Sequence, residues 1–237
     1  METFTVKAFG TSAVDQDLNQ MEIKRRVTTA TDIEIEILYC GVCHSDLHTA
    51  RNDWGFTTYP AIPGHEIVGK VTKIGNEVTK LKVGDVAAVG CLVGSCGTCD
   101  SCKQDLEQYC ANGWVGTYNS PDKHLGGMTY GGYSQKVVVD QHFVLKVPSN
   151  LDLAATAPLL CAGITTWSPL RHWNVTKGTK VAVVGLGGLG HMAIKLAKGL
   201  GADVTLFSRS PGKEKDAKDL GADAVIISTD ENQMNTV

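Results

Sequence analysis

Four cysteines at short intervals constrain this 237-residue chain more than any other feature. They form the run Cys96-x2-Cys99-x2-Cys102-x7-Cys110. A structural zinc ion is held by four ligands in a tetrahedron, and steps of three residues allow a tight loop to turn three sulfurs toward one point. Because four thiolates leave no vacant position, the run predicts a structural zinc and not a catalytic one. Free thiols and an iron–sulfur site are the alternatives, although the run lacks the closing Cys-Pro of ferredoxins.

The composition is that of an ordinary globular protein, with 43% hydrophobic residues, 20% charged residues and a net charge of −3. No run of one charge predicts a nucleic-acid or membrane partner. The N-terminus does not resemble a signal peptide, and no stretch approaches the ~18 apolar residues of a membrane span. We therefore expect a cytoplasmic protein, in which eight clustered cysteines indicate metal binding rather than a disulfide framework.

The pattern of apolar residues predicts an α/β protein with three zones. Residues 1–150 contain short strands at 33–39, 67–74, 86–89 and 136–139, separated by Gly/Asp turns, which favours a β-rich domain. Residues 151–177 show helical spacing and predict a helical linkage. Residues 178–237 alternate strands at 180–184, 204–208 and 224–227 with helices at 190–200 and 213–220. This alternation is typical of the parallel sheet of a Rossmann domain, of which three strands out of six are visible.

Three further potential metal ligands, Cys43, His65 and Cys161, are scattered along the chain. A catalytic zinc typically has three protein ligands and one open position, and two cysteines with one histidine are a known set for alcohol oxidation. Taken alone, so distant a trio is weak evidence, because each residue could equally be an ordinary buried one. We interpret the two remaining cysteines, Cys40 and Cys91, as buried packing groups, although Cys40-x2-Cys43 also has the spacing of a redox pair.

A glycine-rich motif, Gly185-x-Gly187-Gly188-Leu189-Gly190, follows a predicted strand and opens a predicted helix. In that context the motif predicts a dinucleotide site. Gly185 allows the tight turn, Gly187 lets the backbone approach the pyrophosphate, and Gly190 lets helix and strand pack closely. The amides of Gly188 and Leu189 lie at the helix N-terminus, which favours the diphosphate anion.

The end of the next strand indicates NADP(H) rather than NAD. An NAD enzyme usually places an acidic residue about 20 residues after the glycines, where it bonds the ribose 2′-hydroxyl. Here the sequence is Ser208-Arg209-Ser210, with Lys213 behind it. Hydroxyls and cations suit a 2′-phosphate. A solvated turn is the alternative interpretation of Arg209 and Lys213, but the missing acid still favours NADP(H).

The surroundings of these residues resemble a known family. Residues 64–78 match the signature of zinc-containing alcohol dehydrogenases, Gly-His-Glu-x2-Gly-x5-Gly-x2-Val, and the segments 41–46, 158–166 and 185–190 follow in that family's order. The chain resembles the medium-chain zinc alcohol dehydrogenases over essentially its whole length, in particular the cinnamyl alcohol dehydrogenases and the bacterial NADP-dependent aldehyde reductases. The resemblance implies a GroES-like catalytic domain followed by a Rossmann NADP-binding domain, and full-length relatives that are homodimers.

The resemblance also implies a role for each residue near the metal. Cys43, His65 and Cys161 would hold the catalytic zinc. Glu66 would approach the metal and help to exchange its fourth ligand. Asp46 would orient His65 through the other nitrogen of its ring.

Proton transfer and substrate binding involve further residues. Ser45 would take the proton of the alcohol and His48 would pass it to solvent, while an ordinary surface position is the alternative for His48. The resemblance implies that Thr165 lies near the nicotinamide. Aromatic candidates for the wall of the substrate pocket, for each of which simple packing is an equal alternative, are Trp54, Trp114 and Tyr118.

These features predict an oxidoreductase with two zinc ions per chain that transfers hydride reversibly between NADP(H) and primary alcohols or aldehydes, aromatic or medium-length. Trp114 is shifted relative to the pocket tryptophan of plant members, which favours a broad aldehyde reductase over a cinnamyl-specific enzyme. The family's chains continue beyond residue 237, so we expect an incomplete nicotinamide pocket and little or no activity of this chain as given. The alternative is an inactive, zinc-stabilised fragment; a thiol-redox protein is a third, less favoured hypothesis.

Overall fold

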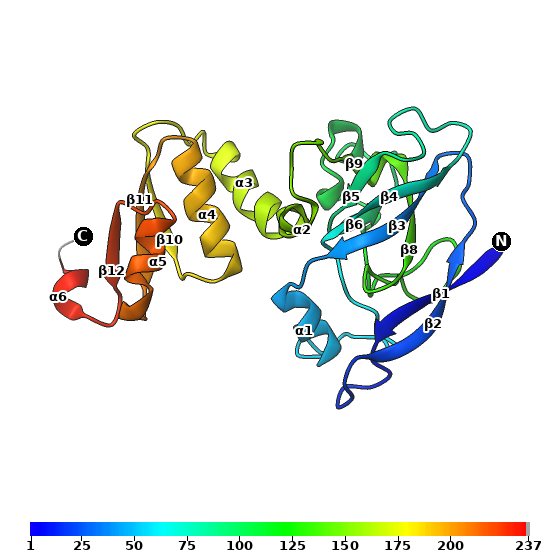
Figure 1. Ribbon diagram of the computed structural model, residues 1–237, viewed down its shortest axis with the longest axis horizontal. Helices are drawn as coiled ribbons and strands as arrows, with labels where there is room; N and C mark the ends of the chain where they lie inside the picture. The colour runs from blue at the N-terminus through cyan, green and yellow to red at the C-terminus, as the bar shows by residue number, and fades with distance from the viewer. Residues whose placement is uncertain (236–237) are drawn as a thin grey trace. The chain divides into compact units, whose positions relative to one another are not determined.

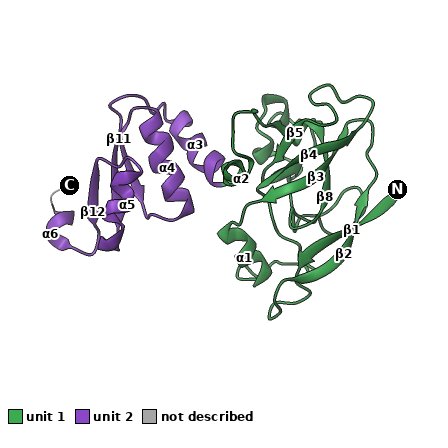
Figure 2. Ribbon diagram, in the orientation of Figure 1, with its two compact units in different colours: residues 1–161 green, residues 162–237 purple. Residues whose placement is uncertain are grey.

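The computed structural model describes residues 1–235. The chain forms two compact units, a first unit from Met1 to Cys161 and a second that begins at Ala162 (Figure 2). The predicted division into three zones, with limits at residues 150 and 177, stays a prediction. The last two residues of its third zone, 236 and 237, lie outside the described residues.

A five-stranded antiparallel sheet in the order β8-β3-β4-β5-β9 is the framework of the first unit (Figure 1). Strands are present at all four predicted positions. Gly/Asp turns separate these strands, and apolar β-branched residues fill the interior of the unit. The strands are β3 (Asp32–Cys40), β4 (Ile67–Ile74), β5 (Val86–Val89), β8 (Lys136–Asp140) and β9 (Leu145–Lys146).

Two smaller antiparallel pairs complete the β-structure of the first unit. One consists of β1 (Thr3–Gly10) and β2 (Asn19–Arg26), and the other of β6 (Leu92–Gly94) and β7 (Val115–Gly116). In β1 every second residue from Val6 onward is buried, as expected for a strand with one face on the core. The main core lies on the five-stranded sheet and includes Ile33, Ile35, Ile67, Val71 and Val89.

Short helices lie in the loops of the first unit. The α-helices are α1 (His44–Ala50) and α2 (Leu153–Thr156), and the 3-10 helices are η1 (Cys102–Gln104), η2 (Glu107–Tyr109), η3 (Gln141–Phe143) and η4 (Ala157–Leu160). The Asp46 side chain accepts a hydrogen bond from the amide of Cys43 at 2.9 Å and thereby caps the start of α1. Asp152 is the N-cap residue of α2, and its side chain accepts a hydrogen bond from the amide of Ala155 at 2.8 Å.

The second unit is a three-stranded parallel sheet, β10-β11-β12, with helices connecting its strands. The predicted strand–helix alternation is present. Its core is formed by small and branched side chains from helix and sheet, such as Ile194, Val204 and Leu206. The elements are α3 (Ala162–His172), β10 (Lys180–Val184), α4 (Gly188–Gly199), β11 (Asp203–Ser208), η5 (Pro211–Lys213), α5 (Glu214–Asp219), β12 (Ala224–Ile227) and α6 (Glu231–Met234).

Within residues 1–235, no single helix is long and apolar enough to cross a membrane. The segments Leu153–Leu160 and Ala162–His172 meet the length and composition requirements only together, as a bent pair.

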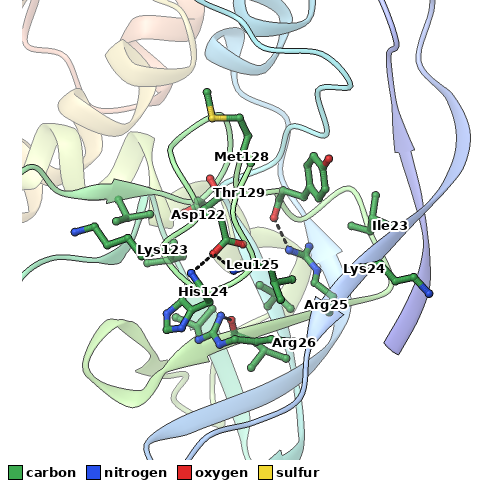
Figure 3. Close-up of a pocket in the computed structure, with 18 of the residues that line it drawn as sticks. Ile23, Lys24, Arg25, Arg26, Asp122, Lys123, His124, Leu125, Met128 and Thr129 are labelled. Atoms are coloured by element: carbon green, nitrogen blue, oxygen red, sulfur yellow. Dashed lines mark hydrogen bonds between the residues drawn. The ribbon is translucent and has the colours of Figure 1, made fainter. Parts of the chain in front are cut away.

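A cavity of about 420 Å³ lies in the first unit, between β2, β6, β7, β8 and the loop of residues 121–130 (Figure 3). The buried Arg25 is on its wall. The Arg25 guanidinium donates to the carbonyls of Lys136, Tyr130 and Gly131 and to the hydroxyl of Ser134, at 2.7–2.9 Å. Burial lowers the pKa of Arg25 to about 10, so the side chain stays protonated at neutral pH and ties β2 to the segment before β8.

The carboxylate of Asp32 is a second buried charge, and it makes the stability of the first unit depend on pH. It accepts hydrogen bonds from two nitrogens of Arg26, at 2.7 and 3.1 Å, and from the amide and hydroxyl of Thr29. Burial raises the pKa of Asp32, but these bonds outweigh burial and hold the pKa below its usual value. A lowered folded-state pKa stabilises the protein above the unfolded pKa of about 3.9, and this contribution is lost as pH falls through the folded pKa.

We therefore expect Asp32→Asn to lower the free energy of unfolding by about 3 kcal/mol at pH 7, because it leaves Arg26 without its partner. The difference from the wild type should shrink as the pH falls below about 4. Urea unfolding at pH 7 and in acid measures both values. Asp15→Asn, at an exposed position of the same unit, is the control. A difference between Asp32→Asn and wild type that stays constant with pH would contradict the role assigned to the carboxylate.

Candidate functional site

Three loops of the first unit carry the predicted catalytic zinc ligands. Cys43 lies between β3 and α1, immediately before the first helical residue. His65 and Glu66 lie directly before β4, and Cys161 follows η4. His65, Glu66 and Cys161 are buried and Cys43 is half-buried, so the fold brings residues 118 positions apart to one place inside the unit.

The geometry of these side chains fits a zinc ion. The ligand atoms of Cys43, His65, Glu66 and Cys161 all lie within 4.8 Å of one another. The sulfurs of Cys43 and Cys161 are 3.8 Å apart, and two thiolates at about 2.3 Å from a tetrahedral zinc would be separated by roughly the same distance. The Nε2 atom of His65 is buried and has no hydrogen-bond partner among residues 1–235. A buried nitrogen without a partner is costly, and a metal ion would satisfy it.

A network of hydrogen bonds centres on Asp46 behind these ligands. Its Oδ2 accepts from the amide of Cys43 and from the hydroxyl of Tyr133, both at 2.9 Å, and its Oδ1 accepts from the amide of Gly64 at 3.0 Å. On the other side of the His65 ring, Nδ1 lies 3.1 Å from the Tyr118 hydroxyl and 3.5 Å from Asp46 Oδ1. Burial, and then Asp46, raise the pKa of both Tyr118 and Tyr133, so both keep their protons.

Glu66 is 3% exposed and lies beside the loop that carries Cys43. Burial raises its pKa, and the neighbouring His65 lowers it in part. A Cβ atom at Gly41 would overlap the Glu66 carboxylate, so any side chain there would have to displace it. The Glu66 carboxylate is thus held close to the three predicted ligands.

The two predicted proton-relay residues lie on α1. The Ser45 hydroxyl is 3.5 Å from the sulfur of Cys43. His48 is about one third exposed, its Nδ1 is 2.7 Å from the carboxylate of Asp53, and its ring stacks on His44. The structure therefore places Ser45 beside the candidate metal position and His48 at the surface, with one ring nitrogen engaged by an acid.

The four clustered cysteines also converge. The sulfurs of Cys96, Cys99, Cys102 and Cys110 lie within 4.8 Å of one another. Cys102 is 3.9 Å from Cys96 and 3.5 Å from Cys99, sulfur to sulfur, again close to the edge of a zinc–thiolate tetrahedron. Hydrogen bonds, first of all from the amide of Thr98, lower the pKa of Cys96 to about 5. Such bonds favour the thiolate, which is the form that binds metal.

All eight cysteines are free in the structure, including Cys40 and Cys91. Burial raises the pKa of Cys40 to about 12, which makes its thiol unreactive. The Cys91 sulfur is 3.8 Å from the carbonyl of Leu160. A third group of possible ligands, Asp105, Glu107 and His142, lies at the surface, where His142 and Glu107 already pair at 2.5 Å.

In the second unit the glycine-rich motif forms the turn from β10 to α4. Gly185 has φ +88°, a conformation that favours glycine. A Cβ atom at Gly190 would overlap the Gly185 carbonyl, so the close packing expected of this position is present. The space around Gly187 and Gly188 is open, which leaves the N-terminus of the 12-residue helix α4 accessible to an anion.

The predicted 2′-phosphate residues lie after β11. Ser208 is the last residue of the strand, and its hydroxyl accepts from the amide of Ser210 at 3.1 Å. Arg209 is exposed. The amine of Lys213 donates to the carbonyl of Leu186 at 2.8 Å, so a cation spans from this loop to the glycine-rich turn. The remaining predicted cofactor residue, Thr165, is exposed on α3.

The candidate pocket aromatics have different environments. Trp54 is 48% exposed and stacks on Phe56, and Trp114 is 49% exposed. Tyr118 contacts the His65 ring at 5.4 Å between centroids, so it belongs to the candidate metal site. The cavity of Figure 3 contains none of the predicted zinc ligands or relay residues and is a separate feature of the unit.

A β-rich unit with two metal-ligand clusters, followed by a unit with a dinucleotide-binding turn, defines a zinc-binding dehydrogenase. Comparison with protein families agrees. The family model "Alcohol dehydrogenase GroES-like domain" matches residues 29–149, and "Zinc-binding dehydrogenase" matches residues 188–237. The chain therefore belongs to the zinc-dependent alcohol dehydrogenase family, in the branch of the cinnamyl alcohol dehydrogenases and NADP-dependent alcohol dehydrogenases.

Individual relatives support this membership. NADP-dependent alcohol dehydrogenase C 1 of Mycolicibacterium smegmatis is 54% identical over 95% of this chain. A cinnamyl alcohol dehydrogenase from Sorghum bicolor has a similar structure, with TM-score 0.95 and 45% identity over 98% of this chain and 67% of that one. The Helicobacter pylori enzyme, solved with NADP(H), gives TM-score 0.92 and 44% identity over 95% of this chain and 65% of that one. The chain spans 65% of the length of the M. smegmatis protein.

Proposed function

We propose that this protein is an oxidoreductase that transfers hydride reversibly between NADP(H) and primary alcohols or aldehydes, with a catalytic and a structural zinc ion in each chain. The observation that carries the proposal is the convergence of Cys43, His65 and Cys161 around a buried, unpartnered His65 Nε2. The names of the relatives, which include NADP-dependent and cinnamyl alcohol dehydrogenases, agree with it. Cytoplasmic location and a homodimeric assembly stay predictions.

The residues near the candidate metal position have separate tasks in this proposal. Zinc, when bound, is a Lewis acid that lowers the pKa of an alcohol and polarises a carbonyl. Ser45, 3.5 Å from Cys43, accepts the proton of the alcohol during oxidation and returns it during reduction. His48 exchanges that proton with solvent, because its ring is partly exposed and an imidazole can both accept and donate a proton. Glu66 is close enough to take part in exchanging the fourth ligand.

The second unit binds the dinucleotide in this proposal. The diphosphate lies against the open N-terminus of α4 at Gly187 and Gly188. Arg209 and Lys213, with the hydroxyls of Ser208 and Ser210, bind the 2′-phosphate. No acidic side chain follows β11 there to bond a free 2′-hydroxyl, which is the property expected of an NADP enzyme.

A substitution at Arg209 tests the choice of cofactor. We expect Arg209→Ala to weaken NADPH binding about 10- to 100-fold, because a charge-assisted hydrogen bond contributes about 1.5–3 kcal/mol. The affinity for NADH should change little, since NADH has no 2′-phosphate. Fluorescence titration with each cofactor gives both dissociation constants. Lys195→Ala, which removes an exposed cation elsewhere on the second unit, is the control. Equal losses for the two cofactors would contradict the assignment.

The zinc content of protein purified without chelator or added metal tests the proposal as a whole. We expect two zinc ions per chain by elemental analysis, one for each cluster. One or none would mean that the catalytic trio is not a metal site in this chain. NADPH consumption with aromatic and medium-length aldehydes then tests turnover. Two zinc ions without turnover would favour the alternative of an inactive, zinc-stabilised chain.

A further inference from the structure

The proposed catalytic zinc requires one particular tautomer of His65. A neutral imidazole carries one proton on one of its two nitrogens. Nδ1 lies at Tyr118 and Asp46, which leaves Nε2 as the nitrogen available to the cluster of Cys43 and Cys161. Nε2 has no hydrogen-bond partner in the described part of the chain. To bind a metal, Nε2 must have a free lone pair. The proton therefore lies on Nδ1, and Nδ1 must donate a hydrogen bond.

Two oxygens compete to accept that hydrogen bond. The Tyr118 hydroxyl is 3.1 Å from Nδ1, which is within the usual range for N–H···O bonds. The nearer oxygen of Asp46 is 3.5 Å away, which is beyond that range. Asp46 Oδ1 is also engaged by the amide of Gly64 at 3.0 Å. The shorter distance selects the tyrosine.

The Tyr118 hydroxyl lies in a buried, polar environment. Asp46 and Thr49, both of which are almost completely buried, are among its neighbours. The amides of Cys43 and Gly64 and the Tyr133 hydroxyl donate to Asp46 and fix its carboxylate. The pair formed by His65 Nδ1 and the Tyr118 hydroxyl therefore lies beside a carboxylate that is held in place.

We propose that Tyr118 is the positioning residue for the metal ligand His65, because its hydroxyl accepts the hydrogen bond from Nδ1. The inference rests on the proposed zinc site and adds to it a residue that holds the ring in its metal-binding tautomer. The aromatic ring of Tyr118 also packs against His65, at 5.4 Å between centroids and an angle of 31°. Because the hydroxyl and the ring have separate effects, a substitution can remove the first and keep the second.

Tyr118→Phe is the test, with Tyr133→Phe as its matched control. Tyr118→Phe keeps the packing and removes the acceptor at Nδ1. We expect zinc affinity at the Cys43–His65–Cys161 site to fall about 10- to 100-fold, the usual effect of losing such a partner. Tyr133→Phe also removes a phenol that bonds Asp46, but it leaves the acceptor of Nδ1 in place. Its zinc affinity should stay close to that of the wild type. Competition with a chromophoric chelator measures both.

Nuclear magnetic resonance of zinc-loaded, 15N-histidine-labelled protein provides a readout that a purely structural role would not move. In the wild type we expect a His65 proton on Nδ1 that exchanges slowly with solvent. In Tyr118→Phe that proton should shift and exchange faster, while in Tyr133→Phe it should not. Retention of the zinc in the four-cysteine cluster shows that each variant is folded.

The outcomes separate the inference from the proposed function. A wild-type chain that holds zinc only in the four-cysteine cluster overturns both. If the wild type holds two zinc ions and Tyr118→Phe binds them equally well, with an unchanged Nδ1 proton, the inference alone is wrong. Equal losses in Tyr118→Phe and Tyr133→Phe would also overturn it, because the effect would then pass through Asp46 and not through the hydroxyl at His65.

Discussion

Cys99→Ser is expected to remove one zinc ion per chain and to unfold the lobe of residues 95–113 while the five-stranded sheet stays intact. The helices of this lobe are short 3-10 helices. Its buried residues are two of the four cysteines, Cys102 and Cys110. Structural zinc sites in small domains contribute on the order of 10 kcal/mol of folding free energy. The lobe has no apolar core of comparable size to replace the metal.

Elemental analysis and hydrogen exchange followed by mass spectrometry measure the two effects. Exchange in residues 95–113 should become fast in Cys99→Ser, while exchange in β3 and β4 stays slow. Ser101→Ala is the matched control, because Ser101 lies in the same lobe and its side chain caps no helix. A full complement of zinc and unchanged protection in Cys99→Ser would show that the four cysteines do not hold a structural metal.

His65→Ala is expected to remove the other zinc ion and leave the structural one. The substitution deletes the buried Nε2 and leaves two of the three predicted ligands, fewer than a catalytic zinc typically has. Any NADPH-dependent aldehyde reduction should fall roughly 10³-fold, since a catalytic metal supplies several kcal/mol of transition-state stabilisation and each 1.36 kcal/mol is tenfold in rate.

The control for this variant is His124→Ala, which removes an exposed histidine from the same unit. It should keep both zinc ions. The zinc count is the primary measurement, because it can be made whatever the rate of turnover. Two zinc ions in His65→Ala would exclude His65 as a ligand, whereas the loss of both would show that the two clusters do not form independently.

Most strands and helices could be predicted because they are short apolar runs with clear ends. The strand at 180–184 and the helix after the glycine-rich turn are examples, since the chain there changes from a run of apolar residues to helical spacing. The first hairpin could not be found in this way. Only two of the eight residues of β2 are buried, and the strand consists largely of polar side chains, so hydrophobicity does not mark it. The start of α1 has a sequence signal. Asp46 stands three residues after Cys43, the position from which a side chain caps the first turn of a helix.

The candidate site was predictable as a set of residues, but not as a network. The motifs around Cys43, His65 and Cys161 indicated possible ligands, and the structure brings these side chains together. The contact between His65 and Tyr118 could not be predicted, because the two residues are 53 positions apart and only the tertiary fold makes them neighbours. The same holds for Tyr133, which reaches Asp46 across 87 positions. Hydrogen-bond partners of this kind depend on distances that spacing does not encode.

The position of Cys161 at the end of the first unit has a consequence for the unfolded chain. A metal held by Cys43 and Cys161 would be a cross-link that closes a loop across a separation of 118 residues, within a first unit that runs from Met1 to Cys161. Closing so long a loop lowers the conformational entropy of the unfolded state by an amount equivalent to about 5 kcal/mol. The ion would therefore act on the first unit as a reversible cross-link that stabilises it by lowering the entropy of the unfolded chain. Its removal by a chelator would free the segments around Cys43 and Cys161 at the same time.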